Sequence, residues 1–363
     1  MKKLLFAVTT DLNYDQRMQR ICSSLARNGY QVTLVGRAWE QSEPLQAKPY
    51  RQHRLRCFFN KGKLFYVEFS VRLFFYLLRR RFDAYCAIDL DTVLPVFFNA
   101  KLAQKPFIYD AHEYFPEVIE VANRKFIKKI WLGIEQFIVT RTSFAYTVTQ
   151  SIADLFKEKY GTHFSVIRNI SAYQPFVPAP KPVKYILYQG AVNEGRGIEQ
   201  LLEAMPLINT ELVICGRGDL FDAMVAKSRE LGIQHKVHFK GYVLPDELQT
   251  ITRGAWLGYN LLENKGLSYY FSLANKFFDY IHAGIPQLCV AFPEYTHLNK
   301  EFEVAVMTEL TPEAIAAAVN KLLNEPALYN KLAANCEKAR HQLNWQHEEQ
   351  KLLDFYQNIW TNP

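Results

Sequence analysis

Short apolar runs alternate with helix-like patterns along almost the whole chain, and this alternation limits the possible folds more than any other feature. Runs such as Leu4–Val8 and Ala84–Ile88 lack the polar alternation of half-exposed strands, which is typical of strands buried on both faces. Between such runs lie segments such as Asp15–Asn28, which carries apolar residues on one helical face and stops before Gly29. Strands of this kind separated by helices predict an α/β fold, with a parallel sheet covered on both faces.

The pattern begins again in the second half of the chain. The other strands predicted in the first half are Val32–Val35, Phe107–Tyr109, Tyr146–Val148 and Ser165–Ile167. Those of the second half are Tyr185–Tyr188, Leu212–Cys215, Val237–Phe239, Trp256–Tyr259 and Gln287–Val290. The helices predicted there are Gly197–Met205, Leu220–Leu231, Asn275–His282 and the stretch from about Thr311 onward. Both halves therefore read as doubly wound α/β units.

The restart divides the chain into domains. Residues 171–184 hold four prolines and little helical or strand signal, which is typical of a linker. We expect one domain over residues 1–170 and a second over residues 185–344, and 363 residues fit two domains. Residues 345–363 are expected to form a C-terminal helix that packs back on the first domain. With two such sheets, the cleft between the domains is the expected ligand site.

Composition excludes several classes of protein. Hydrophobic residues make up 49% of the chain and charged residues 22%, which is average for a globular protein and excludes a disordered or fibrous one. The six cysteines show no C-x-x-C pair, which disfavours a disulfide framework or a thiolate zinc site and suits a reducing cytoplasm. The first apolar stretch ends before Asp11, too early for a signal peptide. No run reaches the roughly 18 apolar residues of a membrane span.

The net charge of +7 is unevenly distributed, since residues 1–170 carry +11 and residues 171–363 carry −4. Residues 48–81 hold ten Lys and Arg against one acidic residue, Glu68, with aromatic residues interleaved, and residues 124–131 repeat the pattern. Such segments suit an anionic membrane surface. The alternative is that the aromatic side chains are core and the charges are solvated. Nothing else here resembles a nucleic-acid module, so we expect no nucleic-acid partner.

The most informative segment for function is Tyr269–Pro286, YYFSLANKFFDYIHAGIP. Ser272 or Asn275 can cap a helix whose free N–H groups favour an anion. Lys276 adds a point charge for phosphate. Asp279, one turn further on, can accept hydrogen bonds from two neighbouring hydroxyls, as on a ribose. The alternative is an ordinary amphipathic helix with a solvated lysine.

Two glycine turns follow strands in the second half. Gly190 ends one predicted strand, and Arg196 and Gly197 lie in the loop that opens the next helix. Glycine lets the backbone approach a ligand closely, and arginine can engage two phosphate oxygens at once. Gly216 begins a similar turn after the following strand. These turns lie at one edge of the predicted sheet and together favour a ligand site. A tight strand–helix turn with a solvated arginine is the alternative.

In the first half, a predicted strand ends at Asp110 and is followed by His112 and Glu113. Histidine suits proton exchange or a switchable hydrogen bond near neutral pH. Glu113 beside it can orient a substrate hydroxyl. A buried structural turn is the alternative.

With these segments assembled, the chain resembles the GT-B fold, retaining glycosyltransferases of group 1, family 4, over nearly its whole length. The most specific match is Ser272–Pro286, which is similar to the family variant S-L-P-N-K-x-F-E-Y-x-x-A-G-x-P. The resemblance implies two Rossmann-like domains facing a central cleft. The acceptor would bind the domain over residues 1–170, and the nucleotide-sugar donor the domain over residues 185–344.

The resemblance also implies roles for single residues. In this match Asp279 replaces the glutamate that holds the ribose, and His112 in YDAHE lies beside the sugar at the reaction centre. Arg196 in GRGIEQLLEAM matches the donor-domain loop whose basic residue binds the diphosphate, and Tyr242 in FKGYV lies near the base. The complete set is Gly190, Arg196, Gly197, Gly216, Tyr242, Asn275, Lys276 and Asp279 for the donor, Asp15 and Arg17 of the D-x-R start for the acceptor side, and His112 and Glu113 for catalysis.

The chain departs from the family at two of these places. Many members carry two glutamates eight residues apart, whereas Phe271 stands eight residues before Asp279. Ala191 stands where many members have an arginine, so diphosphate binding is expected to depend on Arg196 and Lys276.

The function implied is transfer of a sugar from a nucleotide-diphosphate donor to a glycan or lipid-linked acceptor with retention of configuration. Neither a metal nor another cofactor is expected. The implied setting is cell-surface polysaccharide or glycoconjugate synthesis, in the cytoplasm and peripherally on the inner face of the membrane. The alternatives are a nucleotide-sugar epimerase of the same fold and a non-catalytic nucleotide-sugar-binding relative.

Overall fold

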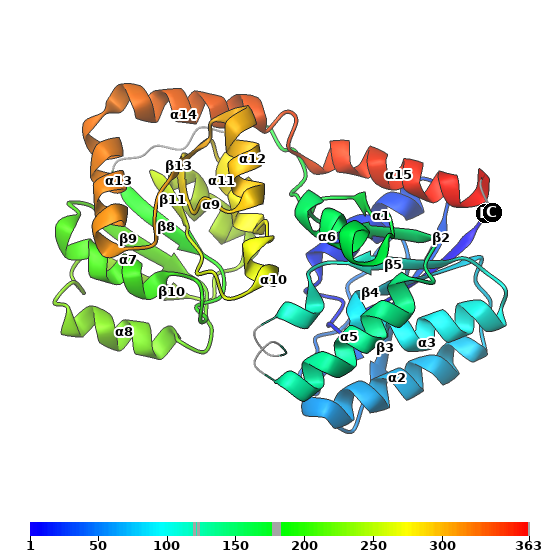
Figure 1. Cartoon of the computed structure of the whole chain (residues 1–363). Coiled ribbons are helices and arrows are strands. Elements are labelled where there is room, and N and C mark those ends of the chain that lie inside the picture. The colour runs from blue at the N-terminus through cyan, green and yellow to red at the C-terminus, as the bar shows by residue number, and fades with distance from the viewer. Residues whose placement is uncertain (119–120, 122–123, 176–182, 362–363) are drawn as a thin grey trace. The chain divides into compact units, whose positions relative to one another are not determined.

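The computed structural model describes residues 1–118, 121, 124–175 and 183–361. The chain divides into two compact units (Figure 1). Unit 1 comprises Met1–Asn169 and Glu348–Pro363, and unit 2 comprises Ile170–His347. Residues 176–182 of the predicted linker lie outside the described residues.

Unit 1 is built, within the described residues, on a parallel sheet of seven strands in the order β3-β2-β1-β4-β5-β6-β7. The strands are β1 (Lys3–Ala7), β2 (Gln31–Ala38), β3 (Arg51–Arg56), β4 (Ala84–Ile88), β5 (Phe107–Ala111), β6 (Phe144–Thr147) and β7 (Ser165–Val166). The helices are α1 (Gln16–Arg27), α2 (Gly62–Leu78), α3 (Asp89–Leu102), the short 3₁₀ helix η1 (Phe115–Glu117), α5 (Lys125–Val139) and α6 (Gln150–Tyr160). The strands β4 and β5 are buried along their whole length, as predicted for strands covered on both faces.

The last helix, α15 (Trp345–Thr361), belongs to unit 1 from Glu348 onward. Figure 1 shows it in red along one side of that unit. Its fully buried Tyr356 ring lies 5.9 Å from the ring of Phe6 and 6.4 Å from that of Tyr146. The helix therefore contributes to the hydrophobic core beside the sheet.

The edge strand β3 was not among the predicted strands. Its sequence, RQHRLR, has no apolar run because it pairs only with β2, and Leu55 alone in it is buried. Residues 48–81 thus divide into this strand and helix α2. In α2, Phe65 and Phe69 are core residues, whereas Phe75 is exposed. The segment therefore contributes aromatic side chains both to the core and to the surface.

Unit 2 is built, within the described residues, on a parallel sheet of six strands in the order β10-β9-β8-β11-β12-β13. The strands are β8 (Tyr185–Gln189), β9 (Glu211–Cys215), β10 (Val237–Gly241), β11 (Leu257–Asn260), β12 (Gln287–Cys289) and β13 (Ala305–Met307). The helices are α7 (Ile198–Ala204), the 3₁₀ helix η2 (Met205–Leu207), α8 (Phe221–Glu230), α9 (Pro245–Gly254), α10 (Leu267–Tyr270), α11 (Asn275–His282), α12 (Pro293–Phe302), α13 (Pro312–Asn324) and α14 (Pro326–Ala339). The prediction of two parallel α/β units is confirmed.

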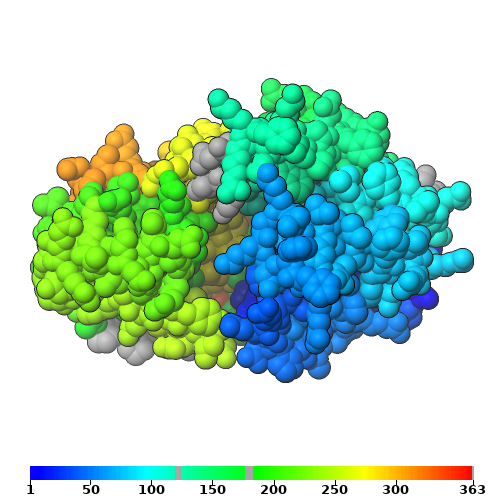
Figure 2. Space-filling view, turned by 90° about the horizontal axis from the view of Figure 1, so that it is seen from below, coloured from blue at the N-terminus to red at the C-terminus, as the bar shows by residue number. Residues whose placement is uncertain are grey.

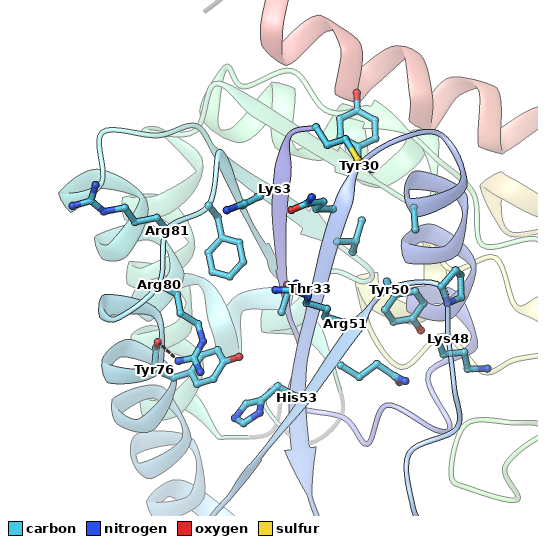
Figure 3. Close-up of a pocket in the computed structure, with 17 residues that line it drawn as sticks. Lys3, Tyr30, Thr33, Lys48, Tyr50, Arg51, His53, Tyr76, Arg80 and Arg81 are labelled. Atoms are coloured by element: carbon cyan, nitrogen blue, oxygen red, sulfur yellow. Dashed lines mark hydrogen bonds between the residues drawn. The ribbon is translucent and has the colours of Figure 1, made fainter.

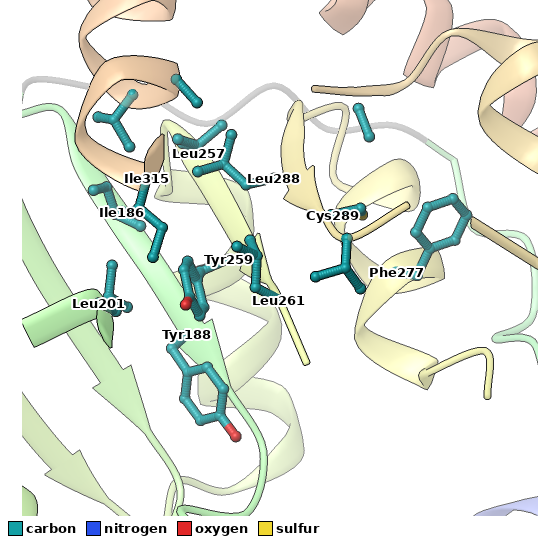
Figure 4. Close-up of a cluster of buried hydrophobic side chains, with 14 of the residues drawn as sticks. Ile186, Tyr188, Leu201, Leu257, Tyr259, Leu261, Phe277, Leu288, Cys289 and Ile315 are labelled. Atoms are coloured by element: carbon teal, nitrogen blue, oxygen red, sulfur yellow. The ribbon is translucent and has the colours of Figure 1, made fainter. Parts of the chain in front are cut away.

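A hydrophobic core fixes the sheet of unit 2 against its helices (Figure 4). Tyr188 from β8, Tyr259 from β11 and Phe277 from α11 are all fully buried in it. Complete burial of a large apolar side chain contributes about 1.5–3 kcal/mol. This packing holds the first turn of α11 near the ends of β8 and β11.

No helix in the described part of the chain combines the length and the apolar character needed to cross a membrane.

Candidate active site

Two glycine turns touch at the carboxyl edge of the sheet in unit 2. Gly190 follows β8 and Gly216 follows β9, with φ angles of 126° and 140°. A Cβ atom on Gly216 would lie 1.8 Å from the carbonyl oxygen of Gly190. Gly197, with φ of 64°, precedes α7. Glycine is required where backbones approach this closely in the left-handed region.

Lys276 buries its ammonium group against these turns. The residue is 7% exposed, and its Nζ lies 3.8 Å from the centroid of the Tyr188 ring. Among the described residues, Nζ has no hydrogen-bond partner. Burial, reinforced by the charge of Arg196, lowers the pKa of Lys276 well below its usual range. A buried cation without a counter-ion is costly, so an anionic ligand would complete this environment.

Arg196 supplies a second cation beside Lys276. Its guanidinium carbon lies 5.0 Å from the centroid of the Tyr269 ring. Its Nε is buried and has no hydrogen-bond partner in the described part of the chain. The burial of Lys276 contradicts the solvated lysine of the alternative interpretation, whereas Arg196 is half-buried.

The predicted caps of α11 are wrong. The residue before the helix is Ala274, which has no capping side chain. The Ser272 hydroxyl instead donates to the carbonyl oxygen of Tyr269 at 2.7 Å, so it is engaged in the preceding turn. Asn275 is the first helical residue and is exposed. The polar side chain nearest the helix start is therefore free to contact a ligand.

Asp279 is half-buried and held in place by two side chains. Its Oδ1 accepts a hydrogen bond from the Ser171 hydroxyl and its Oδ2 accepts one from Nε2 of Gln189, both at 2.9 Å. Oε1 of Gln189 accepts in turn from the Thr252 hydroxyl at 2.8 Å. Sequence reasoning missed Ser171 and Gln189, which lie 108 and 90 positions from Asp279. Tyr242, in the turn after β10, is 67% exposed.

In unit 1, His112 follows β5 and lies between two carboxylates. Its Nε2 is 3.1 Å from Oδ2 of Asp110, and its Nδ1 is 3.6 Å from Oδ2 of Asp89. Burial alone would lower the pKa of His112, but the two carboxylates outweigh it and raise the pKa to about 9. His112 is therefore protonated at neutral pH and offers a hydrogen-bond donor rather than a free base.

Asp110 is fully buried and connects His112 to Arg17. Its Oδ1 lies 3.2 Å from Nη2 of Arg17, which is itself only 4% exposed and whose Nη1 donates to the carbonyl oxygen of Ile167 at 3.1 Å. Burial alone would raise the pKa of Asp110, but Arg17 and His112 lower it. Arg17 thus keeps Asp110 charged beneath His112, and it does not reach the surface.

Asp15 caps α1. Its Oδ1 accepts from the backbone N–H of Met18 at 3.0 Å, and its Oδ2 accepts from the Thr10 hydroxyl at 2.8 Å. Both residues predicted for the acceptor side, Asp15 and Arg17, therefore hold structural positions. Glu113 is exposed beside His112.

Two acidic residues at this edge escaped the sequence prediction, Asp89 and Asp91. Asp89 begins α3 with φ of 52°, and its Oδ1 accepts from the backbone N–H of His112 at 2.8 Å. Burial raises the pKa of Asp89 to about 8 and that of Asp91 to about 6. Acidic residues directly after the buried run Ala84–Ile88 are the signal that would have found them. In the described part of the chain, no group of three or more His, Cys, Asp or Glu is arranged to hold a metal ion.

Two doubly wound parallel sheets, one with glycine turns and buried cationic side-chain nitrogens at its carboxyl edge, are typical of α/β proteins that bind ligands at that edge. The sequence matches two family models. Glycosyl transferases group 1 matches residues 170–339, and Glycosyltransferase Family 4 matches residues 16–170. Together they span residues 16–339, so the chain belongs to the group 1, family 4 glycosyltransferases, which are retaining and metal-independent by family. It is thus an enzyme that uses nucleotide sugars.

Comparison with individual proteins shows which known fold the chain shares. Over 76 residues the sequence is 41% identical to an uncharacterised glycosyltransferase of Methanocaldococcus jannaschii, and this match covers 20% of each chain. Sucrose-phosphate synthase from Thermosynechococcus elongatus has a TM-score of 0.85 at 16% identity, with both chains covered completely. HepE of Anabaena in complex with UDP-glucose has a TM-score of 0.76 at 11% identity, over 99% of this chain and 100% of that one. These structures confirm the predicted GT-B fold.

Proposed function

We propose that this glycosyltransferase moves a sugar from its nucleotide-diphosphate donor to a glycan or lipid-linked acceptor in cell-surface polysaccharide or glycoconjugate synthesis. Unit 2 would serve the donor and unit 1 the acceptor. The observation that carries the proposal is the buried ammonium group of Lys276, which lacks a partner among the described residues and lies against Gly190 and close enough to Arg196 to feel its charge.

Lys276 and Arg196 stabilise the leaving diphosphate in this proposal. Negative charge grows on the diphosphate as the glycosidic bond breaks, and cations already fixed in a dry site need no reorganisation to meet it. The N–H groups in the first turn of α11 add to this field. This arrangement supplies, through side chains, the neutralisation that a metal ion supplies elsewhere.

Asp279 holds the ribose. Ser171 and Gln189 occupy one lone pair on each carboxylate oxygen and fix its orientation. A carboxylate can accept hydrogen bonds from two neighbouring hydroxyls, such as those of a ribose. Tyr242, exposed after β10, contacts the base, and Asn275 approaches the sugar.

His112 donates a hydrogen bond to the transferred sugar, since the charged carboxylate of Asp110 keeps it protonated. Glu113, exposed beside it, orients the acceptor hydroxyl. Because the acceptor attacks from the side of the leaving group, retention needs no carboxylate nucleophile.

The test of the donor assignment is Asp279→Ala, with donor affinity and turnover measured separately. The donor is first found by thermal shift with nucleoside diphosphates, followed by a panel of nucleotide sugars and product analysis. We expect roughly tenfold weaker donor binding, as for loss of a charged hydrogen-bond acceptor. The matched control is Asp222→Ala, which removes an exposed carboxylate from α8. Unchanged donor affinity in Asp279→Ala would refute the ribose role. Donor binding by the unmodified protein without any turnover would support the non-catalytic alternative.

Unit 1 also carries an apolar stripe that suits a membrane surface. Leu64, Val67, Val71, Phe75 and Leu78 of α2 are 50–61% exposed and recur at helical spacing; we call them the α2 stripe. Figure 2 looks onto this side of unit 1, with α2 in blue and α5 in green.

Helix α5 extends this surface. The ring of Tyr66 on α2 lies 6.3 Å from that of Trp131 on α5, so the helices are neighbours. Phe126 and Ile130 of α5 are 73% and 48% exposed, next to the basic residues of 124–131. Exposed apolar side chains among cations match an anionic bilayer that carries a lipid-linked acceptor.

Flotation with vesicles of an anionic phospholipid tests this surface. Val67→Glu/Val71→Glu is expected to abolish flotation at low salt, because it places charge in the α2 stripe. The control is Leu207→Glu/Leu244→Glu, which changes two leucines of unit 2 that are 57% and 64% exposed. Equal flotation of the two variants would contradict the surface assignment.

A further inference from the structure

A second concentration of positive charge lies in unit 1, at the opposite edge of the sheet from His112. A cavity of about 890 Å³ opens there (Figure 3). It is lined where β1, β2 and β3 begin and where α2 has just ended. His112 and Asp110, in contrast, lie at the carboxyl end of β5.

The lining of this cavity is strongly cationic. Lys3, Lys48, Arg51, Arg80 and Arg81 contribute to it, and no Asp or Glu does. Among the described residues, none of these five side chains forms an ion pair within 4 Å. Asp83, just outside the lining, accepts a hydrogen bond from the backbone N–H of Lys3 at 2.8 Å and not from its ammonium group. Lys3, Arg51, Arg80 and Arg81 are exposed and Lys48 is half-buried, so their positive potential is available to an anion from solution.

Aromatic contacts hold part of this charge in place. The ring of His53 stacks on that of Tyr76 at 4.3 Å, and the guanidinium of Arg80 lies 3.7 Å from the centroid of the same ring. Nη1 of Arg80 also donates to the carbonyl oxygen of Tyr76 at 3.1 Å. Burial, aided by the charge of Arg80, lowers the pKa of His53. The contacts with Tyr76 therefore restrain the Arg80 side chain, and its positive charge acts on His53 in the same lining.

Two buried polar atoms in the lining lack hydrogen-bond partners among the described residues. They are the hydroxyl of Tyr50, a residue only 7% exposed, and Oε1 of Gln52. Burial raises the pKa of Tyr50, so its hydroxyl keeps its proton and remains a donor. An unsatisfied buried polar group costs about 1–3 kcal/mol. A buried hydroxyl in the lining of a cationic cavity favours a ligand that accepts hydrogen bonds.

We propose that this cavity binds a phosphate group, carried either by a soluble phosphorylated metabolite or by an anionic lipid headgroup. Arg51 and Arg80 each present a planar fork that matches phosphate oxygens, and the Tyr50 hydroxyl donates a further hydrogen bond. The volume lies within the range of small-molecule sites, about 300–1,000 Å³. The site shares no residue with those proposed for glycosyl transfer, so phosphate binding here can be tested independently of that function.

Calorimetric titration with inorganic phosphate and with glycerol phosphate tests the soluble source. All titrations use the full chain carrying Lys276→Met and Arg196→Gln, so that the two cations proposed to bind the donor diphosphate do not contribute. Arg51→Gln/Arg80→Gln is expected to weaken binding at least about tenfold, since charge-assisted hydrogen bonds are lost. The control, Lys105→Gln/Arg141→Gln, removes equal charge from exposed positions of unit 1 outside the lining and should leave affinity within about twofold.

Tyr50→Phe separates binding from folding. It removes only the unpartnered hydroxyl, so the urea midpoint should not fall, whereas phosphate affinity should drop about threefold to tenfold.

Flotation with phosphatidylglycerol vesicles against phosphatidylcholine vesicles tests the lipid source, in the Val67→Glu/Val71→Glu background that silences the α2 stripe. Binding of soluble phosphate that falls in Arg51→Gln/Arg80→Gln supports the metabolite. Flotation alone that falls in this variant supports the headgroup. No binding in either arm, or binding that the cavity variants leave unchanged, would overturn the proposal.

Discussion

The two units share one architecture but treat buried charge in opposite ways. In unit 1, Arg17, Asp110, His112 and Asp89 form a continuous chain of partners behind β5. In unit 2, the ammonium group of Lys276 is buried over the Tyr188 ring with no partner among the described residues. Buried charges that are paired with each other fix the geometry of a site. A buried charge without a partner is stabilised when an oppositely charged ligand binds. In the function proposed above, unit 1 would therefore be preorganised, whereas unit 2 would be completed by its donor.

The largest effect is expected from breaking the chain of partners in unit 1. Asp110→Ala leaves Arg17 buried without its counter-ion and should reduce the free energy of unfolding by about 3–5 kcal/mol. Urea denaturation measures this loss. The exposed Asp154 of α6 gives the control, since Asp154→Ala should change stability by no more than about 0.5 kcal/mol. Equal losses in the two variants would show that Asp110 is not a stabilising partner.

In unit 2 the same kind of change should affect activity and spare stability. Lys276→Met removes a buried cation that has no partner to lose, so the free energy of unfolding should stay level or rise by about 1 kcal/mol. Transfer should fall about 100-fold in kcat/KM because the leaving diphosphate loses its cation. Lys300→Met, at an exposed position of α12, should change neither quantity. A stability loss like that of Asp110→Ala would remove the contrast between the units.

The titration of His112 tests the paired charges of unit 1 at a single side chain. Its pKa is raised to about 9 in the folded chain, above the ordinary value of about 6.5. Its stabilising contribution is therefore complete below pH 6.5 and is lost as pH rises from 6.5 through 9, by an amount on the order of 1–3 kcal/mol. Proton NMR of the imidazole should give a midpoint near 9. The midpoint should drop in Asp110→Asn, and a wild-type midpoint near 6.5 would contradict the assigned partners.

The smallest effect is expected at Ser171. Ser171→Ala removes a hydrogen bond that orients the Asp279 carboxylate. A hydrogen bond to a charged group contributes about 1.5–3 kcal/mol, and we expect only part of that to be lost from donor binding because the carboxylate itself remains. Donor KM should rise about threefold to tenfold with kcat nearly unchanged. A change confined to kcat would instead place Ser171 in the chemical step.

The elements that position the site were predictable where local sequence decides them. The apolar run Tyr185–Tyr188 and the positive-φ glycines that follow it lie where expected, because burial and backbone geometry leave few alternatives. Strand β3 was missed because an edge strand needs no apolar run. Short edge strand β13, Ala305–Met307, was missed as well.

The partners of the site residues were beyond sequence reasoning. Gln189 and Ser171 reach Asp279 only after the sheet has formed, from positions far along the chain. Asp89 meets His112 because β4 and β5 are neighbours in the sheet, which strand order decides. The burial of Lys276 also depends on packing, since an isolated helix would leave that side chain solvated.

Proton uptake on nucleotide binding tests most directly the role of the buried Lys276 side chain, which has no hydrogen-bond partner among the described residues. Because burial lowers the pKa of Lys276, a bound diphosphate should raise that pKa again and draw a proton from solution. Calorimetry of nucleoside diphosphate binding in buffers of different ionisation enthalpy measures the uptake. We predict uptake of up to about one proton per nucleotide near or above neutral pH, absent in Lys276→Met. Binding without proton uptake, or uptake that persists in Lys276→Met, would contradict the account.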